Sequence, residues 1–336
     1  MKRLRFLLFP VALAYDLVTR IRNLCYQKGW MPVSQFPVYT IGVGNLSVGG
    51  TGKTPMVELL IELFVDQYDI GLLSRGYGRQ TKGFVLANDY STAIDIGDEP
   101  LQIKKKFSNI SVAVDGNRSR GLGELMKLNN PPQLVVLDDV FQHRAITRDV
   151  NILLTTYDKP YFNDFVLPVG NLRESKSGAS RADMIVITKC PKDLSQRTKN
   201  EFISRINPLS NQSIWFSTIA YSDTVFSSSN SCSTKEFLEQ PFTLVTGIAN
   251  SELLVEYLKK LGAQFKQLSF SDHHSFTKKE LEHIRSLGKV LTTEKDFARL
   301  QPQSDLHNCY YLPIKTKLID SKDFKSRLEL LLKLKN

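Results

Sequence analysis

The chain has 336 residues, of which 42% are hydrophobic, so it can fold as a globular protein but is too long for one usual core. Its net charge of +10 indicates an acidic partner, which could be a nucleotide, a nucleic acid, an anionic lipid or a phosphorylated substrate. The four cysteines lie far apart without a C-x-x-C pair, which argues against a zinc site or a disulfide framework and favours a reducing compartment.

The N-terminal stretch "MKRLRFLLFPVALAYD" imitates a secretory signal peptide, because a basic start and an apolar run precede small residues. We favour a different interpretation, since the nucleotide site predicted from residue 47 onward needs a compartment that contains ATP. The run from Phe6 to Tyr15 is also far below the roughly 20 apolar residues that cross a bilayer.

Apolar residues in this region recur at three- and four-residue steps, which is the pattern of an amphipathic helix. These residues are Leu7, Leu8, Val11, Tyr15, Val18 and Ile21, and basic residues accompany them. Such a helix can lie in a membrane surface with its cations among the phosphate head groups. It can equally pack on its own domain, and the pattern alone does not choose between the two.

A glycine-rich stretch, "SVGGTGKTP" at 47–55, follows the strand-like run at 38–45. Its Gly52, Lys53 and Thr54 match the phosphate loop G-x-x-x-x-G-K-[ST], whereas Ser47 replaces the first glycine. The glycines allow backbone N–H groups to turn inward, and 54–64 can begin a helix whose positive end faces an anion. A plain strand-to-helix turn is the alternative, but such a turn would not need Lys-Thr at this place.

We therefore predict a nucleotide site in which Lys53 reaches the outer phosphates and the Thr54 hydroxyl holds magnesium. The predicted nucleotide-binding residues are Ser47, Val48, Gly49, Gly50, Thr51, Gly52, Lys53 and Thr54.

Strand-like and helix-like stretches alternate beyond the loop, as in a mostly parallel sheet with flanking helices. The predicted strands span 69–74, 110–115, 133–139, 150–156 and 183–189, and helices span 99–107 and 119–128. The polar stretch 222–236 indicates a linker or hairpin. Strands at 242–248 and 289–294, helices at 251–262 and 277–288, and a terminal helix follow it.

The predicted fold class is therefore α/β, with a P-loop NTPase-like, mostly parallel sheet and a second, smaller α/β domain. The expected units are an amphipathic helix at 1–28, a kinase-type domain at 29–221 and the smaller domain at 222–336, which would close over the site.

The segment "QLVVLDDVFQHR" places Asp138 and Asp139 at the end of an apolar strand. A carboxylate at this place in a nucleotide site normally holds or positions magnesium. Alternatively, the pair forms only a turn or a helix cap. Gln142 and His143 follow on a segment that we expect to be exposed, where they could meet a substrate or form local hydrogen bonds.

Asp98 and Glu99 directly precede Pro100 and a predicted helix. Aspartate before a helix-opening proline is typical of an N-cap, and the spacing alone favours that role. The same position would also keep Asp98 ionised and able to accept a proton.

Asp272, His273 and His274 hold two of the five histidines. Such a run can bind manganese in phosphoesterases, but the further ligands that this requires are not evident in the sequence. An imidazole positioned against a carboxylate is the more economical functional interpretation. The other interpretation is a polar turn before the helix at 277–288.

Nine short motifs occur along the chain in this order: "GNLSVGGTGKTP", "LLSRGYGR", "GDEP", "DDVFQHR", "LPVGNLRES", "VITKC", "TGIAN", "FSDHHSF" and "TTEKDFARL". Each is weak alone, but the ordered set resembles the bacterial tetraacyldisaccharide 4'-kinases, the lipid A kinases. The resemblance covers nearly the whole chain and includes its basic amphipathic start. Ser47 agrees with it, because the family's loop has the form GGTGKT.

The resemblance implies ATP- and Mg²⁺-dependent phosphorylation of the 4'-hydroxyl of a tetraacyldisaccharide 1-phosphate, a step in lipid A and lipopolysaccharide biosynthesis. It also implies a monomer that is peripheral to the cytoplasmic face of the bacterial inner membrane and binds no nucleic acid. It favours the membrane-surface role for residues 1–28.

The resemblance also assigns site residues. It makes Asp98 the general base, with His273 oriented towards it. Lys53 of the phosphate loop is the third expected catalytic residue. Thr54 and Asp138, with Asp139 or water, would hold magnesium. The expected substrate-binding residues are Arg75, Glu99, Arg118, Gln142, His143, Arg173 and Glu174. Ser175 departs from the family, which often has proline there, so the local turn is less well matched than Arg173 and Glu174.

Two other functional classes share the loop. One is a nucleotide-driven switch or metallochaperone, which would hydrolyse nucleotide without modifying a lipid. The other is a membrane-surface scaffold that binds nucleotide structurally.

Overall fold

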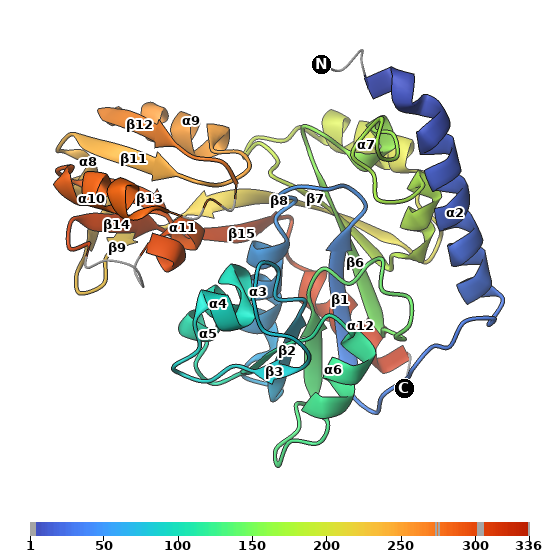
Figure 1. The fold of residues 1–336 in the computed structure, drawn as a ribbon. Helices are drawn as coiled ribbons and strands as arrows, with labels where there is room; N and C mark the ends of the chain where they lie inside the picture. Colours follow the sequence, from blue (N-terminus) through green and yellow to red (C-terminus); the bar gives the residue numbers. More distant parts are fainter. Residues whose placement is uncertain (1–4, 273, 275, 301–305, 335–336) are drawn as a thin grey trace.

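The computed structural model describes residues 5–272, 274, 276–300 and 306–334. These residues form two sheets with covering helices (Figure 1). The first has the order β15-β8-β7-β6-β1-β5-β2-β4-β3, and the second has the order β10-β9-β14-β13-β11-β12. The predicted α/β class is therefore confirmed.

The first sheet is parallel except at its two edges, where β15 and β3 run antiparallel to their neighbours. Its inner strands are buried on both faces, which explains their continuous apolar sequences. Its strands are β1 (Tyr39–Asn45), β2 (Ile70–Ser74), β3 (Val85–Leu86), β4 (Ser111–Val114), β5 (Leu134–Leu137), β6 (Val150–Thr156), β7 (Met184–Thr188), β8 (Ser213–Tyr221) and β15 (Ile314–Ile319).

Helices cover both faces of this sheet. On one face, α3 and α12 enclose the largest core cluster, which contains Phe64, Phe324 and Leu328. On the other face, α6 packs over β2, β4 and β5. The helices on this sheet are α2 (Phe9–Gln27), α3 (Lys53–Phe64), α4 (Ala93–Ile96), α5 (Asp98–Lys106), α6 (Arg118–Leu125), α7 (Gln196–Ile206) and α12 (Phe324–Leu334), with short 3-10 turns η1 (Phe6–Leu8), η2 (Tyr161–Asn163) and η3 (Lys176–Arg181).

The second sheet has its own core, formed by two clusters of buried side chains. The polar stretch at 222–236 is largely the hairpin β9–β10, one of its two predicted forms. The strands of this sheet are β9 (Thr224–Phe226), β10 (Ser231–Ser233), β11 (Phe242–Thr246), β12 (Phe265–Ser269), β13 (Val290–Thr293) and β14 (Cys309–Leu312). Its helices are α8 (Thr234–Leu238), α9 (Glu252–Lys260), α10 (Lys278–Ser286) and α11 (Glu294–Leu300).

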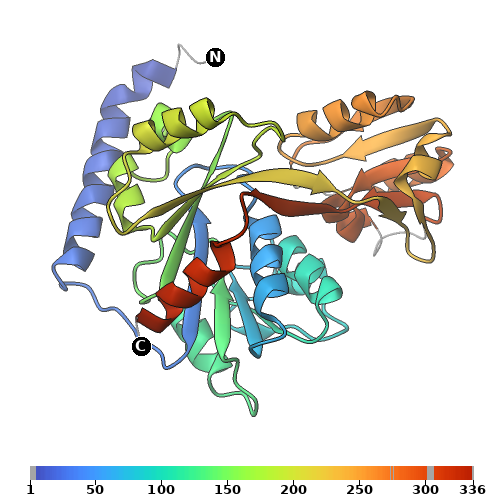
Figure 2. The ribbon, with the colours of Figure 1, turned by 180° about the vertical axis from the view of Figure 1, so that it is seen from behind.

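The chain passes between the sheets at two neighbouring places. It leaves the first sheet after β8 and returns from β14 directly into β15, which pairs antiparallel with β8 (Figure 2). The Ser222 amide donates to the Pro313 carbonyl at 3.0 Å, so the two crossings are hydrogen-bonded. The expected smaller domain at 222–336 thus includes a strand and a helix that pack on the first sheet, and we propose that its compact part ends near residue 313.

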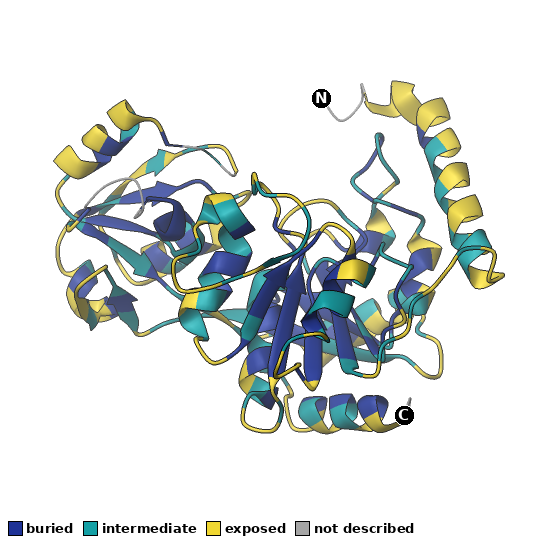
Figure 3. Ribbon diagram, turned by 60° about the horizontal axis from the view of Figure 1, so that its bottom comes forward, coloured by how far each residue is buried: buried dark blue, intermediate teal, exposed yellow. Residues whose placement is uncertain are grey.

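The N-terminal helix α2 faces the protein with its polar side and exposes its apolar side. It contacts the body of the protein through polar groups, whereas ten large apolar side chains between residues 6 and 24 are exposed (Figure 3). Leu7 is 79% exposed and Val18 is 65% exposed, while Ala12 is the helix's buried residue. A helix that packs by its apolar side would bury this surface, whereas α2 contacts its own domain and leaves the surface exposed. Within the described residues, no helix has the length and apolar character needed to span a membrane.

A buried charged cluster lies where α11 of the second sheet meets α3 and α5. Glu58 of α3 is 3% exposed and accepts from Lys106 at 2.5 Å and from Gln102 at 2.9 Å. Glu294 begins α11, and its Oε2 is buried without a hydrogen-bond partner among the described residues. Burial, followed by repulsion from Glu58, raises the pKa of Glu294 to about 7.

Replacing Glu294 with glutamine is expected to stabilise the protein at pH 8 by about 1–2 kcal/mol and to leave it nearly unchanged at pH 5. The raised pKa means that the folded protein retains a proton that the unfolded chain loses above its ordinary value of 4.5. The contribution of this group to stability is therefore complete below that value and is lost as the pH rises through about 7. Denaturant melts of Glu294→Gln at both pH values measure this. The exposed Glu282→Gln is the control, and an equal effect at both pH values would contradict the assignment.

Candidate active site

The glycine loop lies between β1 and α3, at the carboxyl ends of the parallel strands of the first sheet (Figure 1). Gly49 and Gly52 have φ of +107° and +86°, in the left-handed region that favours glycine. Gly52 occupies the N-cap of α3 without a side-chain cap, so the first N–H groups of this helix are available to an anion. The loop thus has the backbone form that phosphate binding requires.

Neighbouring elements hold the loop in this shape. The Val48 amide donates to the Asn171 carbonyl at 2.8 Å, and the Asn45 side chain donates to the Thr51 hydroxyl at 2.8 Å. From the end of β7, Thr188 donates its hydroxyl to the Thr51 carbonyl at 2.8 Å. The loop is therefore preorganised and does not need to fold around its ligand.

Asp138 follows β5 and is 5% exposed. Its Oδ2 accepts from the Ser74 hydroxyl at 2.9 Å, whereas its Oδ1 is buried without a hydrogen-bond partner among the described residues. Burial, followed by the nearby Glu99 charge, raises the pKa of Asp138 to about 6. A buried carboxylate oxygen without a partner fits the place of a cation ligand.

Asp139 differs from its neighbour because it is paired with two cations. Arg173 donates to its two oxygens at 3.0 and 3.1 Å, and Lys53 Nζ lies 3.6 Å from Oδ1. Burial acts to raise the pKa of Asp139, but Lys53 and Arg173 outweigh it and lower the pKa. Asp139 is therefore engaged with Lys53 and Arg173, and we propose that Asp138 is the better suited of the two aspartates to bind a metal.

The part of the chain that the structure describes contains no cluster of three or more His, Cys, Asp or Glu side chains that could hold a metal alone. A magnesium ion here would therefore take ligands from Asp138, the Thr54 hydroxyl and the phosphates themselves. These oxygen donors are of the kind that magnesium prefers.

Arg173, Gln142 and Glu174 belong to one network beside the loop. The Gln142 amide donates to the Asn45 carbonyl at 2.9 Å and to Glu174 at 3.1 Å. Glu174 is 3% exposed and also accepts from Asn23 of α2 at 2.7 Å, so it ties the N-terminal helix to the site. Gln142 and Glu174 hold the scaffold in this structure, and a direct contact of either with substrate stays a prediction.

Arg118 and His143 lie deeper than the sequence suggested. Arg118 is 1% exposed and donates to the carbonyls of Asp115 and Asp138 at 2.7 and 3.1 Å. Burial lowers its pKa to about 10. Burial and the Arg118 charge lower the pKa of His143 to about 4, so its imidazole is neutral at pH 7. Arg118 supports the Asp138 loop, whereas Arg75 is exposed at the end of β2 and could reach a ligand.

Asp98 is the first residue of α5, and the N-cap position belongs to Gly97, whose φ is +89°. The carboxylate of Asp98 accepts from Arg299 Nε of α11 at 2.6 Å. Lys295 of the same helix donates to Glu99 at 3.2 Å. The second sheet therefore supplies two cations to the acidic start of α5, and Asp98 contacts that sheet across the junction.

His273 lies outside the described residues, so its predicted pairing with Asp98 stays a prediction. Its neighbour His274 stacks on Phe270 and lies 3.0 Å from Glu280 of α10. Asp272 Oδ1 lies 4.0 Å from Lys295 Nζ, which places the start of this loop near α5.

Sequence reasoning assigned no role to Arg299, Lys295, Thr188 or Lys189, although their motifs "TTEKDFARL" and "VITKC" were among the nine. The available signal was a lysine or an arginine within or just after a short apolar run. Such a pattern does not show which distant element the side chain will meet.

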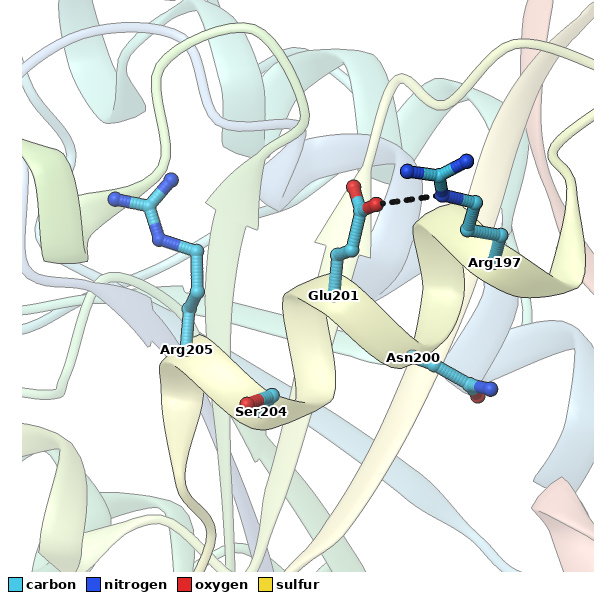
Figure 4. Close-up of a pocket in the computed structure, with 5 residues that line it drawn as sticks. All are labelled: Arg197, Asn200, Glu201, Ser204 and Arg205. Atoms are coloured by element: carbon cyan, nitrogen blue, oxygen red, sulfur yellow. Dashed lines mark hydrogen bonds and ion pairs between the residues drawn. The ribbon is translucent and has the colours of Figure 1, made fainter.

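A shallow hollow over the outer face of α7 is separate from these groups. Arg197, Asn200, Glu201, Ser204 and Arg205 line it, all from one helix (Figure 4). Arg197 and Glu201 pair with each other at 3.2 Å. These side chains are all exposed, and the hollow has the character of ordinary solvated surface.

The parallel sheet, the glycine loop that begins α3 and the carboxylates at the next strand end together define a P-loop phosphotransferase. Comparison with known proteins makes this more specific. A family model for the tetraacyldisaccharide-1-P 4'-kinases matches residues 4–333, and the chain belongs to this family.

Similar proteins agree with this assignment. The tetraacyldisaccharide 4'-kinase of Flavobacterium johnsoniae is 44% identical over 95% of this chain and 94% of its own length. The enzyme of that name from Bacteroides thetaiotaomicron is 39% identical over 95% of this chain and 90% of its own length. The crystal structure of LpxK from Aquifex aeolicus in complex with ATP matches with a TM-score of 0.78 and 30% identity, over 98% of this chain and 99% of that one.

Proposed function

We propose that the protein transfers the terminal phosphoryl group of ATP to the 4'-hydroxyl of a tetraacyldisaccharide 1-phosphate in lipid A biosynthesis. The observation that carries this is the meeting of Lys53 on the phosphate loop with Asp139, next to Asp138, which the Glu99 charge at the start of α5 reaches, within a chain of the 4'-kinase family. A loop that binds phosphate and a carboxylate that accepts a proton are the two parts that transfer to an alcohol requires.

The loop and Lys53 would hold the triphosphate. Since phosphoryl transfer depends mainly on positioning and charge neutralisation, the preorganised N–H groups at the start of α3 supply much of the effect. Asp139 keeps Lys53 directed at the phosphates. Magnesium, bound by Thr54 and Asp138, would neutralise negative charge on the transferred group. Arg173 and Arg75 are the cations that we assign to the substrate or to the transferred group.

Asp98 would accept the proton of the attacking hydroxyl, with His273 oriented towards it. Arg299 fixes the direction of this carboxylate through its 2.6 Å contact, and Glu99 lies beside it for the substrate. Because Arg299 and Lys295 belong to the second sheet, this part of the site is complete only when the two sheets are in contact. The contacts of Arg299 and Lys295 with the start of α5 support the proposal that the smaller domain covers the site.

Labelled ATP incubated with the lipid A disaccharide precursor tests the proposal directly, when the label is followed into the lipid fraction. A kinase labels the lipid. A nucleotide-driven switch releases phosphate without labelling it, and a nucleotide-binding scaffold does neither, so either result would overturn the proposal.

We also propose that the protein works as a monomer at the cytoplasmic face of the inner membrane, without nucleic acid, and that α2 rests in the membrane surface. The exposed apolar face of α2 supports this, with Arg5, Arg20 and Lys28 exposed beside it. Its inner face contacts Glu174 and the Arg173 carbonyl, which places the membrane-facing helix directly against the active site. The hydroxyl of a lipid in the membrane could then reach the active site while the lipid stays close to the membrane surface.

The double variant Leu17→Glu/Val18→Glu is expected to bind anionic vesicles at least about 10-fold more weakly, because two exposed apolar contacts become charged. These residues are 59% and 65% exposed, so the fold and the binding of ATP should not change. Sedimentation with vesicles measures the effect, and turnover of vesicle-borne substrate should fall with it. Leu261→Glu, at a site 51% exposed at the end of α9, is the control. Unchanged sedimentation would remove α2 from the membrane surface.

A further inference from the structure

The inner side of α2 is hydrogen-bonded to one short segment of the candidate site, residues 171–175, which we call the bridge segment. The Tyr15 hydroxyl donates to the Arg173 carbonyl at 2.8 Å, and the side-chain amide of Asn23 donates to Glu174 at 2.7 Å. Exposed arginines donate to side chains at both ends of the segment, Arg5 to Asn171 and Arg20 to Ser175. The helix is therefore attached at residues that hold the candidate site together.

The bridge segment is paired with the phosphate loop on its other side. The Arg173 amide donates to the Leu46 carbonyl at 2.7 Å, and Ser47 forms an antiparallel bridge with Leu172. The Arg173 side chain extends the connection, because it donates to Asp139 at 3.0 Å, beside the lysine of the loop. A continuous set of hydrogen bonds therefore runs from the N-terminal helix through the bridge segment to the groups that would bind phosphate.

Polar contacts, rather than a packed core, hold α2 in this docked position. Its less exposed residues include a stripe at three- and four-residue steps along one side: Ala12, Tyr15, Thr19, Asn23 and Tyr26. Ala12 is the buried residue of the helix. Each hydrogen bond of this kind contributes little net stability, because water competes for the same groups. The helix can therefore leave its docked position at a modest cost in free energy.

A lipid surface and a bound nucleotide favour the same docked position. When the apolar side of α2 lies in a membrane, its polar stripe must turn to the aqueous side, where the rest of the protein lies. In water the apolar side is exposed, so any other way of burying it competes with docking. The phosphates of a nucleotide favour the arrangement in which the loop and Arg173 are already ordered, and that order includes the bridge segment.

We propose that membrane binding by α2 and nucleotide binding by the phosphate loop strengthen each other through Tyr15, Asn23 and the bridge segment. Tyr15 and Asn23 are positioning residues, because they act through Arg173 and Glu174. The kinase site is then fully ordered when the protein lies on the lipid surface that carries its substrate. This inference rests on the proposed function in two respects, that the loop binds ATP and that α2 binds a membrane surface.

Titration of the full-length protein with the non-hydrolysable ATP analogue AMP-PNP and Mg²⁺ tests the coupling without any lipid substrate. Vesicles of phosphatidylglycerol and phosphatidylcholine are expected to strengthen binding of the analogue by about 5-fold, at the lower end of ordinary coupling between two sites. Because such coupling is reciprocal, the analogue should strengthen sedimentation with the vesicles by the same factor. Equal affinity for the analogue with and without vesicles would overturn the proposal.

Variants on the inner side of α2 test the route of the coupling. The double variant Tyr15→Phe/Asn23→Ala is expected to reduce the factor to less than about two, because both contacts with the bridge segment are lost. Its apolar side is unchanged, so it should still sediment with vesicles. Tyr26→Phe is the matched control, since it keeps the ring that lies against Arg22 and Arg144, and it should retain the full factor.

A full factor that survives in the double variant would also overturn the proposal. Glu174 keeps its ion pair with Arg181 at 2.7 Å in that variant, so the fold should be retained. Should the variant nevertheless fail to fold, hydrogen exchange of the unmodified protein decides the question. Vesicles alone are expected to slow exchange at 46–48 and 171–175, and unchanged exchange there would exclude the route.

The two proposals can fail separately. Vesicles that strengthen binding of the analogue, in a protein that does not label the lipid A precursor, would contradict the proposed function and leave the coupling standing. A protein that labels the lipid, but whose affinity for the analogue does not respond to vesicles, would contradict the coupling alone.

Discussion

Lys53→Ala is expected to reduce lipid phosphorylation by roughly 1,000-fold while the fold is retained, the scale on which single cationic or hydrogen-bonding groups stabilise charged transition states. Lys53 begins α3 and lies 3.6 Å from Asp139, so it is positioned at the anion site before any ligand binds. Its removal leaves Asp139 paired with Arg173 at 3.0 Å, which protects the local structure. The initial rate of label transfer to lipid measures the loss.

Lys104→Ala is the control for this variant. Lys104 lies on α5 of the same sheet and pairs with the exposed Asp89 at 3.3 Å, so its loss removes a cation without touching the loop. Its activity should remain normal. Full activity of Lys53→Ala, in a preparation that melts like the unmodified protein, would show that the loop is not the phosphate site.

Asp98→Asn is expected to keep the melting temperature and ATP binding but to lose on the order of 100- to 10,000-fold in turnover, the range for a general base. Asparagine has nearly the same shape as aspartate and can still accept a hydrogen bond from Arg299, but it cannot take the proton. The alternative role as an N-cap would give a stability loss of about 1 kcal/mol and normal chemistry. Gly97 occupies that cap, which makes the two outcomes easier to separate.

Asp95→Asn provides a matched comparison for Asp98→Asn. Asp95 is a true capping carboxylate, since it accepts from the Thr92 amide at 2.8 Å in the capping box of α4, three residues before Asp98. Its loss should affect stability slightly and turnover hardly at all. If Asp98→Asn behaves like Asp95→Asn, Asp98 is not the base. If His273 works with Asp98, adding His273→Ala should cost much less than the product of the two single losses.

The fold of the first sheet could be predicted well because its strands are short, continuous apolar runs. The expected strand 150–156 coincides with β6, and the strand at 183–189 contains β7. The strand β8, with the sequence "SIWFSTIAY", and the exposed β12 were missed. Such strands carry mixed polarity, and their pairing comes from neighbours that are distant in sequence, so a local pattern does not reveal them.

The site could be predicted on the phosphate side and only in part on the acceptor side. The glycine loop and the strand ending in Asp138 are local features with their own sequence signals. The pairing of Asp139 with Arg173 and of Asp98 with Arg299 joins segments 34 and 201 residues apart. The burial of Arg118 has the same origin, because nothing in its local sequence shows that the Asp138 carbonyl, 20 residues away, will accept from it.

The paired crossing between the sheets has a consequence for how the chain folds during synthesis. β15 and α12 leave the ribosome after the second sheet, yet β15 forms an edge of the first sheet and α12 covers part of its core. Until residues 224–312 have been made, the core face beside Phe64 lacks Phe324 and Leu328 and stays open to solvent. Early folding of the second sheet would bring the two crossings together and shorten the effective loop that β15 must close onto β8. A nascent chain arrested before residue 314 is therefore expected to bind chaperones. The second sheet would then help the nucleotide-binding unit to fold, in addition to covering its site.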